Sequence, residues 1–307
     1  MTGASVGNAG NRPSMRRRVL AFPLVAMILA LIAVIGPIFA FALTMQTLPL
    51  DVFPEDVALS LVLIGATLIS IVMYKIVVTR LGESPRDDLP FDVRMHDGWL
   101  GAVYAALLMS AIVGVVALLG GYAILGWGGS TSWPMLLFGA GLQAAFVEEI
   151  VARGILFRFL EEFGGSWFAL AASSALFGFA HASNDNASTF SSLAISLEAG
   201  VLLGGAYMLT RDLWLPIGIH FGWNVTQGYL WDVPVSGAAV DGLVEAETRG
   251  PELISGGAFG VEASIVAIVV ATAVGLWLVV LAARRGHVVR PWWVRRRLAR
   301  AGEAKRP

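Results

Sequence analysis

Long apolar stretches, separated by short polar connections, run along the whole chain. Crossing the roughly 30 Å hydrocarbon core of a bilayer takes about 20 helical residues, and most of these stretches reach that length. Lipid offers no partner to bare backbone groups, so the stretches must be helices. They predict an all-α, polytopic transmembrane helix bundle with about eight spans, at 19–45, 57–78, 99–125, 134–160, 166–182, 190–209, 213–231 and 263–283. The third stretch contains Gly120 and Gly121, at which a helix can be interrupted.

The composition supports a membrane protein and excludes a soluble domain. Hydrophobic residues make up 57% of the chain, charged residues only 14%, and the mean hydropathy is +0.74. A soluble domain has roughly 25% charged residues. We therefore expect an integral, multi-pass protein of the plasma membrane. The chain has no cysteine, which excludes disulfides, thiol nucleophiles and thiolate metal sites.

Basic residues are segregated along the chain, and this predicts its orientation. The tail 1–18 carries four arginines and no acid, and the tail 284–307 carries nine basic residues and one acid. The connection 232–262 instead has six acids and one basic residue, Arg249. Basic loops stay in the cytoplasm, so eight spans with both termini cytoplasmic place 20 of the 21 basic residues at or near that side. Segment 232–262 then becomes an acidic external loop, and its glycines and acids predict that it is flexible.

Two features at the termini allow alternatives. The first stretch, after its arginines, resembles a signal peptide, but it is longer than the 7–15 residues of a signal core, which favours a retained first span. Trp292 and Trp293 lie among the arginines of the last tail. Such a tail can bind nucleic acid, but beside a membrane exit it more often attracts anionic headgroups. We therefore predict membrane lipid as a partner and no nucleic acid.

Few ionisable side chains lie inside the predicted spans, and each is a candidate functional group because charge in lipid is costly. Glu149 and Arg153 are four residues apart and can pair on one helix face, which leaves Glu148 free for another partner. Such a pair could equally be a structural tie between helices. The other candidate groups are His181, Glu198, His220 and Asn224, for which a structural role in helix packing is also open. Lys75 and Arg158 lie near span ends, where their charges can reach the membrane interface.

Three short motifs occur in order on the fourth, fifth and seventh predicted spans: EExxxR at 148–153, FxxxH at 177–181 and HxxxN at 220–224. Phe177 and His181 are four residues apart, so the phenyl ring can pack beneath the imidazole. Together they resemble the CPBP intramembrane proteases, also called the Abi or type II CAAX prenyl endopeptidase family. The resemblance covers about 134–231. It implies that the fourth to seventh helices, at 134–231, are catalytic. The segment 19–133 then supplies the first three transmembrane helices and 263–283 supplies the eighth.

The resemblance also implies a role for each motif residue. Glu148 would be the general base for a hydrolytic water, and His181 would orient that water. His220 and Asn224 would donate to the oxyanion. Three residues would support them: Glu149, Arg153 and Phe177. The implied substrates are membrane proteins or lipidated peptides, with CAAX-type processing as one class. Glu198 belongs to none of the motifs.

The sequence fits two mechanisms for activating the water, one with zinc and one without metal. His181 and His220 with a carboxylate would suit catalytic zinc, as in a metalloprotease. The chain lacks HExxH, however, and Asn is a poor zinc ligand. A metal-free, glutamate-dependent mechanism fits about equally well.

Two rival functions are weighed against a protease. A proton-coupled transporter would also hold Glu and His at mid-depth, but no inverted repeat is visible in the sequence. A non-catalytic membrane scaffold, or a bacteriocin-immunity-like factor, would not need the full set of Glu148, His181, His220 and Asn224. The sequence therefore favours the protease.

Overall fold

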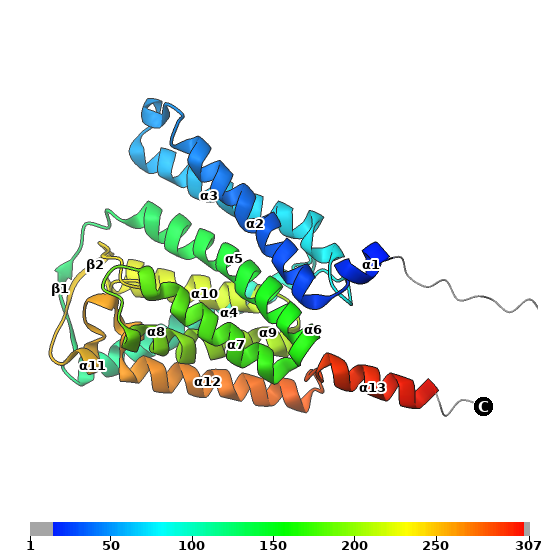
Figure 1. The fold of residues 1–307 in the computed structure, drawn as a ribbon. Helices are drawn as coiled ribbons and strands as arrows, with labels where there is room; N and C mark the ends of the chain where they lie inside the picture. The colour runs from blue at the N-terminus through cyan, green and yellow to red at the C-terminus, as the bar shows by residue number, and fades with distance from the viewer. Residues whose placement is uncertain (1–14, 304–307) are drawn as a thin grey trace, which may run out of the picture.

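A computed structural model describes residues 15–303, and the parts of the two predicted basic tails at 1–14 and 304–307 lie outside it. The fold is almost entirely helical, which confirms the predicted class (Figure 1). Its α-helices are α1 (Met15–Leu20), α2 (Pro23–Met45), α3 (Glu55–Ile76), α4 (Met95–Leu118), α5 (Ala144–Glu149), α6 (Arg158–Gly164), α7 (Ser166–Ala180), α8 (Thr189–Ile195), α9 (Val201–Thr210), α10 (Trp214–Val225), α11 (Glu252–Ser255), α12 (Ile265–Arg284) and α13 (Trp292–Glu303).

Four π-helical segments and several 3₁₀ turns extend these helices. The π segments are η3 (Met135–Gln143), η4 (Ile150–Phe157), η6 (Ser196–Gly200) and η7 (Thr226–Leu230). The 3₁₀ turns are η1 (Leu50–Val52), η2 (Val78–Arg80), η5 (His181–Ser183), η8 (Gly257–Phe259) and η9 (Val261–Ala263). Two strands, β1 (Tyr122–Trp127) and β2 (Val244–Thr248), complete the fold.

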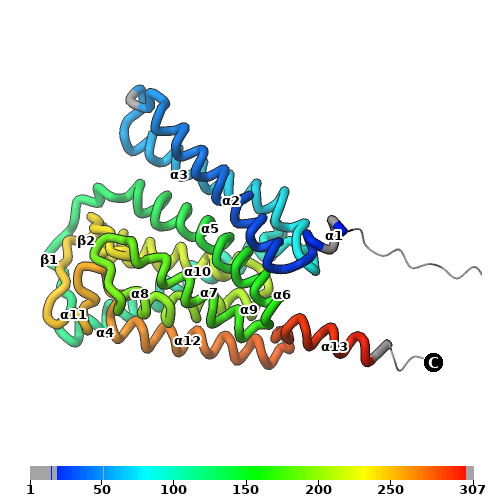
Figure 2. Tube along the Cα trace, viewed as in Figure 1, coloured from blue at the N-terminus to red at the C-terminus, as the bar shows by residue number. Residues whose placement is uncertain are grey.

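The helical runs pass back and forth between two ends of the molecule, and the first and last described helices, α1 and α13, lie at the same end (Figures 1 and 2). Six helices of the described chain are long and apolar enough to cross a membrane: Pro23–Met45, Glu55–Arg80, Met95–Leu118, Met135–Gly164, Thr189–Thr210 and Ile265–Arg284. The prediction of an integral membrane protein is thereby confirmed. Helix α7 has 15 residues, and the continuous run of α10 and η7 has 12 and 5 residues. Each of these two helical runs is short for a membrane span. Eight spans and cytoplasmic termini stay predictions.

The third predicted span is too long at its end. Helix α4 stops at Leu118, whereas the prediction extended to residue 125. Gly120 adopts φ +79°, a left-handed conformation that glycine reaches without strain and that commonly ends a helix. The chain then forms β1, which pairs with β2 in antiparallel register from Tyr122 opposite Thr248 to Trp127 opposite Val244.

The acidic segment 232–262, which the sequence predicts to be flexible, contains regular secondary structure and buried residues. This segment supplies β2, α11 and two 3₁₀ turns, and it buries Val233, Phe259 and Glu262. Asp232 fixes its path, because the carboxylate accepts the backbone N–H groups of Gly242 at 2.7 Å and of Ala246 at 3.0 Å. Glycines and acids here therefore make turns and caps, and local composition alone did not reveal them.

Helix α10 lies in close backbone contact with α4. A side chain at Gly218 would collide with the backbone of Gly98, and one at Gly222 would collide with the backbone of Ala102. Small residues let helices approach this closely in membranes. The crossing fixes α10, which carries the HxxxN motif.

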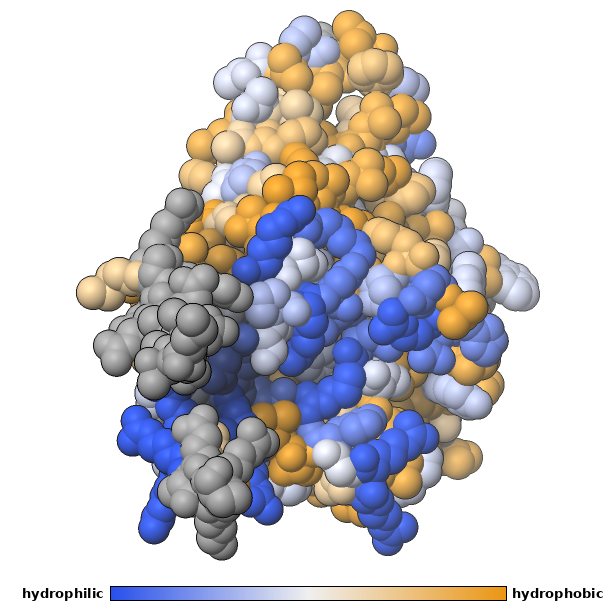
Figure 3. Space-filling model, turned by 90° about the vertical axis from the view of Figure 1, so that its right-hand side faces the viewer, coloured by the Kyte–Doolittle hydropathy of each residue, from blue (hydrophilic) through white to orange (hydrophobic). Residues whose placement is uncertain are grey.

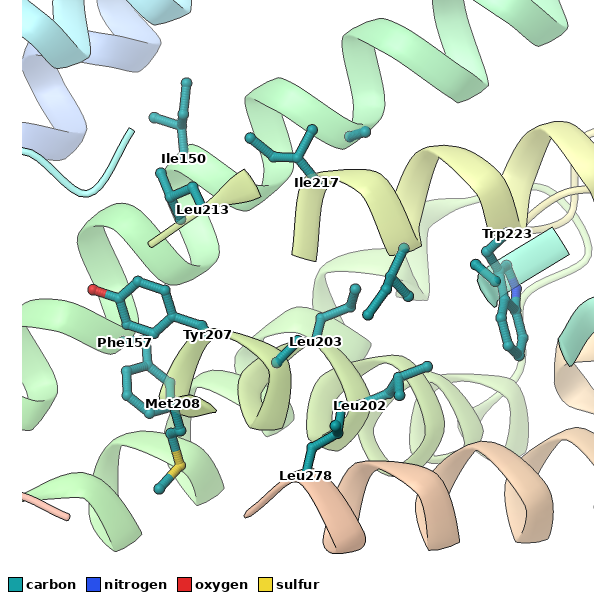
Figure 4. Packing of buried hydrophobic residues seen from close by; sticks show 14 of the residues in the cluster. Ile150, Phe157, Leu202, Leu203, Tyr207, Met208, Leu213, Ile217, Trp223 and Leu278 are labelled. Carbon is teal, nitrogen blue, oxygen red and sulfur yellow. The ribbon is translucent and has the colours of Figure 1, made fainter. Parts of the chain in front are cut away.

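Large apolar side chains hold α9, α10 and α12 together (Figure 4). Leu202 of α9 packs near Leu278 of α12, and Trp223 of α10 belongs to the same buried cluster. The rings of Phe157 and Tyr207 meet edge to face with centroids 5.2 Å apart. This packing fixes η4 and α10, which both contribute polar groups to one interior site.

Polar side chains gather at the end that carries α1 and α13, bordered by hydrophobic ones (Figure 3). The buried Arg158 guanidinium donates to the carbonyl oxygens of Arg86 at 3.0 Å, Ser84 at 3.3 Å and Leu81 at 3.4 Å. These bonds tie the connection between α3 and α4 to the run that carries the EExxxR motif.

The same connection is also tied to α9. The Tyr207 hydroxyl donates to Asp88 at 2.7 Å and accepts from Arg86 at 3.0 Å. The end that we predict to be cytoplasmic is therefore held by polar contacts, whereas apolar packing holds the middle of the molecule.

Reporter fusions test the predicted topology. Ser130 follows β1, Asn186 precedes α8 and Gly242 precedes β2, and these connections lie at the end opposite to α1 and α13 (Figure 1). Arg86 lies between η2 and α4 and contacts Arg158 at the start of α6, at the end that carries α1 and α13. Because basic loops stay inside, we expect external signals at the first three positions and an internal signal at Arg86. An internal signal at Gly242 would contradict the eight-span arrangement.

Candidate active site

The two motif glutamates end the short helix α5, between the π-helical segments η3 and η4. Neighbouring helical residues point about 100° apart, and the two carboxylates here have different surroundings. Glu149 is fully buried, whereas the Glu148 side chain is 37% exposed and faces a cavity. Single π turns within helices are frequent at functional sites, because they redirect side chains and release backbone carbonyls.

Glu149 is held by two partners. Its Oε1 accepts from Arg153 Nη1 at 2.8 Å and lies 2.9 Å from His220 Nδ1. Arg153 also donates from Nη2 to the carbonyl oxygens of Ala199 at 3.2 Å and Gly200 at 3.3 Å. The pair that helical spacing predicted is thus present. The contact with His220 was not predicted, because it depends on how α10 packs against α5.

The two histidines are fixed through the same ring atom. His181 Nδ1 lies 2.8 Å from the carbonyl oxygen of Phe177, which can only accept, so Nδ1 carries a proton. His220 Nδ1 faces the Glu149 carboxylate in the same way. In a neutral imidazole this leaves Nε2 with a free lone pair. Glu148 Oε2 lies 3.9 Å from Nε2 of both His181 and His220.

Phe177 packs among the charged and ring groups of the site. Its ring centroid lies 4.9 Å from that of His181 and 6.1 Å from that of His220. The Arg153 guanidinium lies 4.5 Å from the Phe177 centroid, in cation–π range. The spacing in the sequence predicted only the contact with His181. Phe177 therefore positions three of the motif side chains.

Asn224 lies one turn after His220 on α10. Its Nδ2 donates to the carbonyl oxygen of Ala140, in η3, at 2.8 Å. The second amide N–H and the amide oxygen remain available for other partners. The structure thus brings all six charged or polar motif residues into one interior region.

Two cavities meet at Glu148 and His181. One, of about 400 Å³, is lined by these two residues with His220 and Asn224, together with parts of η3 and of the segments 183–185 and 235–238. The other, of about 330 Å³, is mostly apolar, and its lining includes Ile35, Val147, Val151, Leu156, Leu176 and Ala180. A bound molecule can therefore reach the Glu148 carboxylate from a polar side and from an apolar side.

Residues 129–226 match the family model of type II CAAX prenyl endopeptidase, Rce1-like. This range is similar to an Rce1-like domain. The resemblance predicted from the three motifs is confirmed, and the matched range contains every motif residue. The Rce1-like family is a family of proteases of the CAAX type. Comparisons with curated proteins and with solved structures give no significant match.

The side chains of this Rce1-like site include residue types that bind zinc. A zinc-bound histidine usually donates its other ring N–H to a carboxylate or a backbone carbonyl, and His220 and His181 have these two partners. The Nε2 atoms of both histidines lie 3.9 Å from Glu148 Oε2. Within residues 15–303, no group of three or more His, Cys, Asp or Glu side chains is arranged to hold a metal ion.

Proposed function

We propose that the Rce1-like domain is an intramembrane endopeptidase that hydrolyses peptide bonds of membrane-associated proteins or lipidated peptides. The observation that carries this proposal is the position of Glu148. Its Oε2 lies 3.9 Å from Nε2 of His181 and of His220. That oxygen is buried and has no hydrogen-bond partner in the described part of the chain. An unpaired carboxylate beside two fixed imidazoles is suited to bind and deprotonate a water molecule.

Each polar residue of the site has its own role in hydrolysis. Water held between Glu148 and His181 Nε2 attacks the scissile carbonyl carbon, and Glu148 takes its proton. The C–N bond then breaks, and Glu148 returns the proton to the leaving amine. Asn224 Nδ2, and Nε2 of His220 when the ring is protonated, donate to the oxyanion that forms meanwhile.

The two cavities fit a substrate that is part peptide and part apolar. The cavity of about 400 Å³ exposes the polar groups that an extended peptide needs. The apolar cavity of about 330 Å³ adjoins the same carboxylate and accepts a hydrophobic side chain or a lipid chain. Peptides with a lipidated C-terminus, the CAAX type, therefore form one substrate class that the site accommodates.

A comparison of membrane proteomes tests the function. Cells that make the wild-type protein should yield new protein ends that are missing from cells making Glu148→Gln at equal level. Identical ends in both samples would contradict proteolysis.

Zinc would be held by Nε2 of His181 and His220 and would supply a more acidic bound water. Because no group of three or more His, Cys, Asp or Glu side chains within residues 15–303 is arranged to hold a metal ion, we expect protein stripped of metal to keep its cleavage activity. Zinc content and cleavage rate are measured before and after chelation. One zinc per chain, with activity lost on chelation and restored by zinc, would contradict the metal-free mechanism.

A further inference from the structure

A third, small cavity adjoins the two histidines. Its volume is about 30 Å³, and its polar lining consists of His181, Glu198, His220, Asn224, Ser236 and Glu262. Glu148 lines the two larger cavities instead. The side chains of His181, His220 and Asn224 border both this cavity and the one of about 400 Å³. They therefore form the wall between Glu148 and Glu198.

Glu198 lies in the π-helical segment η6 and is 1% exposed. Neither carboxyl oxygen has a hydrogen-bond partner among the side chains and backbone groups of residues 15–303. The nearby Arg153 donates to the carbonyls of Ala199 and Gly200, and to Glu149, rather than to this carboxyl. A buried carboxylate that has no hydrogen-bond donor takes up a proton rather than keep its charge. The surroundings of Glu198 therefore favour a neutral carboxyl.

Glu262, in η9, is the second acid of this cavity and is also 1% exposed. It accepts the backbone N–H of Ser236 at 2.5 Å. Burial raises the pKa of Glu262, and the hydrogen bond from Ser236 and the nearby His181 partly oppose the shift. Two carboxyls that share one small cavity cannot both be ionised at low cost. Any negative charge of the pair therefore resides on Glu262, which has a donor, and the proton on Glu198.

The cavity has the size and polarity that bound water requires. A water molecule needs about 10–15 Å³ of such space and two to four polar partners. A volume of about 30 Å³ admits about two molecules by this measure. The unpartnered oxygens of Glu198 and the amide of Asn224 supply the partners.

We propose that Glu198 is a positioning residue of the proteolytic site, whose neutral carboxyl binds water, with Glu262, against the side of Asn224 that faces away from the substrate. The inference rests on the proposed function. Asn224 Nδ2 is already bound to Ala140, so a water molecule that donates to the amide oxygen fixes the amide plane. The second N–H of Asn224 is then held toward the cavity that receives the oxyanion.

Infrared spectroscopy tests the neutral, hydrated carboxyl without reference to catalysis. We expect a carbonyl stretch of a protonated carboxyl that shifts when H₂O is replaced by D₂O and disappears in Glu198→Gln. The spectrum of Glu262→Gln identifies any contribution of Glu262 to the same part of the infrared spectrum. Absence of a band that Glu198→Gln removes, or a band insensitive to D₂O, would overturn the proposal.

Kinetics test the positioning role with matched variants. Glu198→Leu, which cannot hold water, should lower kcat at least about tenfold, a part of the 10²–10³ that loss of an oxyanion donor costs, with KM nearly unchanged. Glu198→Gln, neutral and of similar shape, should retain most of kcat. Ser192→Ala is the control, because Ser192 is buried in the same helical run with a hydroxyl that lacks a partner in the described chain, and it lies outside the cavity.

Two kinetic results would overturn the proposal: wild-type kcat in folded Glu198→Leu, or Glu198→Gln as inactive as Glu198→Leu. If Glu198→Leu does not fold, the kcat of Glu198→Gln and the infrared band of the wild-type protein test the proposal instead. If the wild-type protein cleaves nothing, the proposed function fails, and the infrared result still decides whether Glu198 is a neutral, hydrated carboxyl.

Discussion

Glu148→Gln should lower the cleavage rate by at least about 10², while the melting temperature of the detergent-solubilised protein stays nearly unchanged. Glutamine keeps the size and most of the hydrogen bonding of glutamate but cannot take a proton from water. Glu148 makes no ion pair shorter than its 3.9 Å approaches to His181 and His220. Its replacement therefore leaves no close charged partner behind. The measurements are the cleavage rate and the melting temperature of variant and wild type side by side.

The neighbouring carboxylate provides the matched comparison. Normal cleavage by Glu148→Gln, with a stable but inactive Glu149→Gln, would reverse the assignment of the base. Normal cleavage by both variants would contradict proteolysis itself, and a scaffold or transporter would become the better explanation.

Glu149→Gln should lower the stability of the protein, in contrast to Glu148→Gln. Glu149 is fully buried, and its Oε1 contacts both Arg153 and His220. Glutamine keeps an acceptor oxygen but loses the charge that compensates Arg153. Breaking a buried pair in this way costs about 3–5 kcal/mol in soluble proteins. We therefore expect a lower melting temperature or yield. We also expect reduced activity, because His220 loses the carboxylate that its Nδ1 contacts.

A second substitution separates charge from packing. Glu149→Gln combined with Arg153→Gln should recover part of the lost stability, since it removes the uncompensated cation. A double variant as unstable as the sum of the two single variants would show that the ion pair is not the cause.

Helical periodicity predicted the parts of the site that lie within one helix. The spacing of Glu149 and Arg153 gave their pairing, and the place of Glu148 on another face left it free for the histidines. The spacing of Phe177 and His181 gave the packing of ring against ring. These are contacts between residues three or four positions apart, which depend only on local geometry.

Contacts between helices could not be predicted in the same way. The approach of His220 to Glu149 spans 71 positions in the chain and depends on the close crossing of α4 and α10. Glu198 is visible in the sequence as an intramembrane acid, whereas Glu262 falls in the segment that the sequence predicts to be an external loop. Only the folding of segment 232–262 back over the site brings both acids into one cavity.

The hydrogen bonds of Arg158 show that the matched range depends on residues outside it. Arg158 lies inside the matched range 129–226 and is fully buried, yet its three carbonyl acceptors belong to Leu81, Ser84 and Arg86. A fragment limited to the matched range would bury this guanidinium without those acceptors or expose it to lipid, and either change is costly. The Rce1-like region is therefore a unit of sequence similarity but not an autonomous folding unit. The N-terminal helices complete its interior.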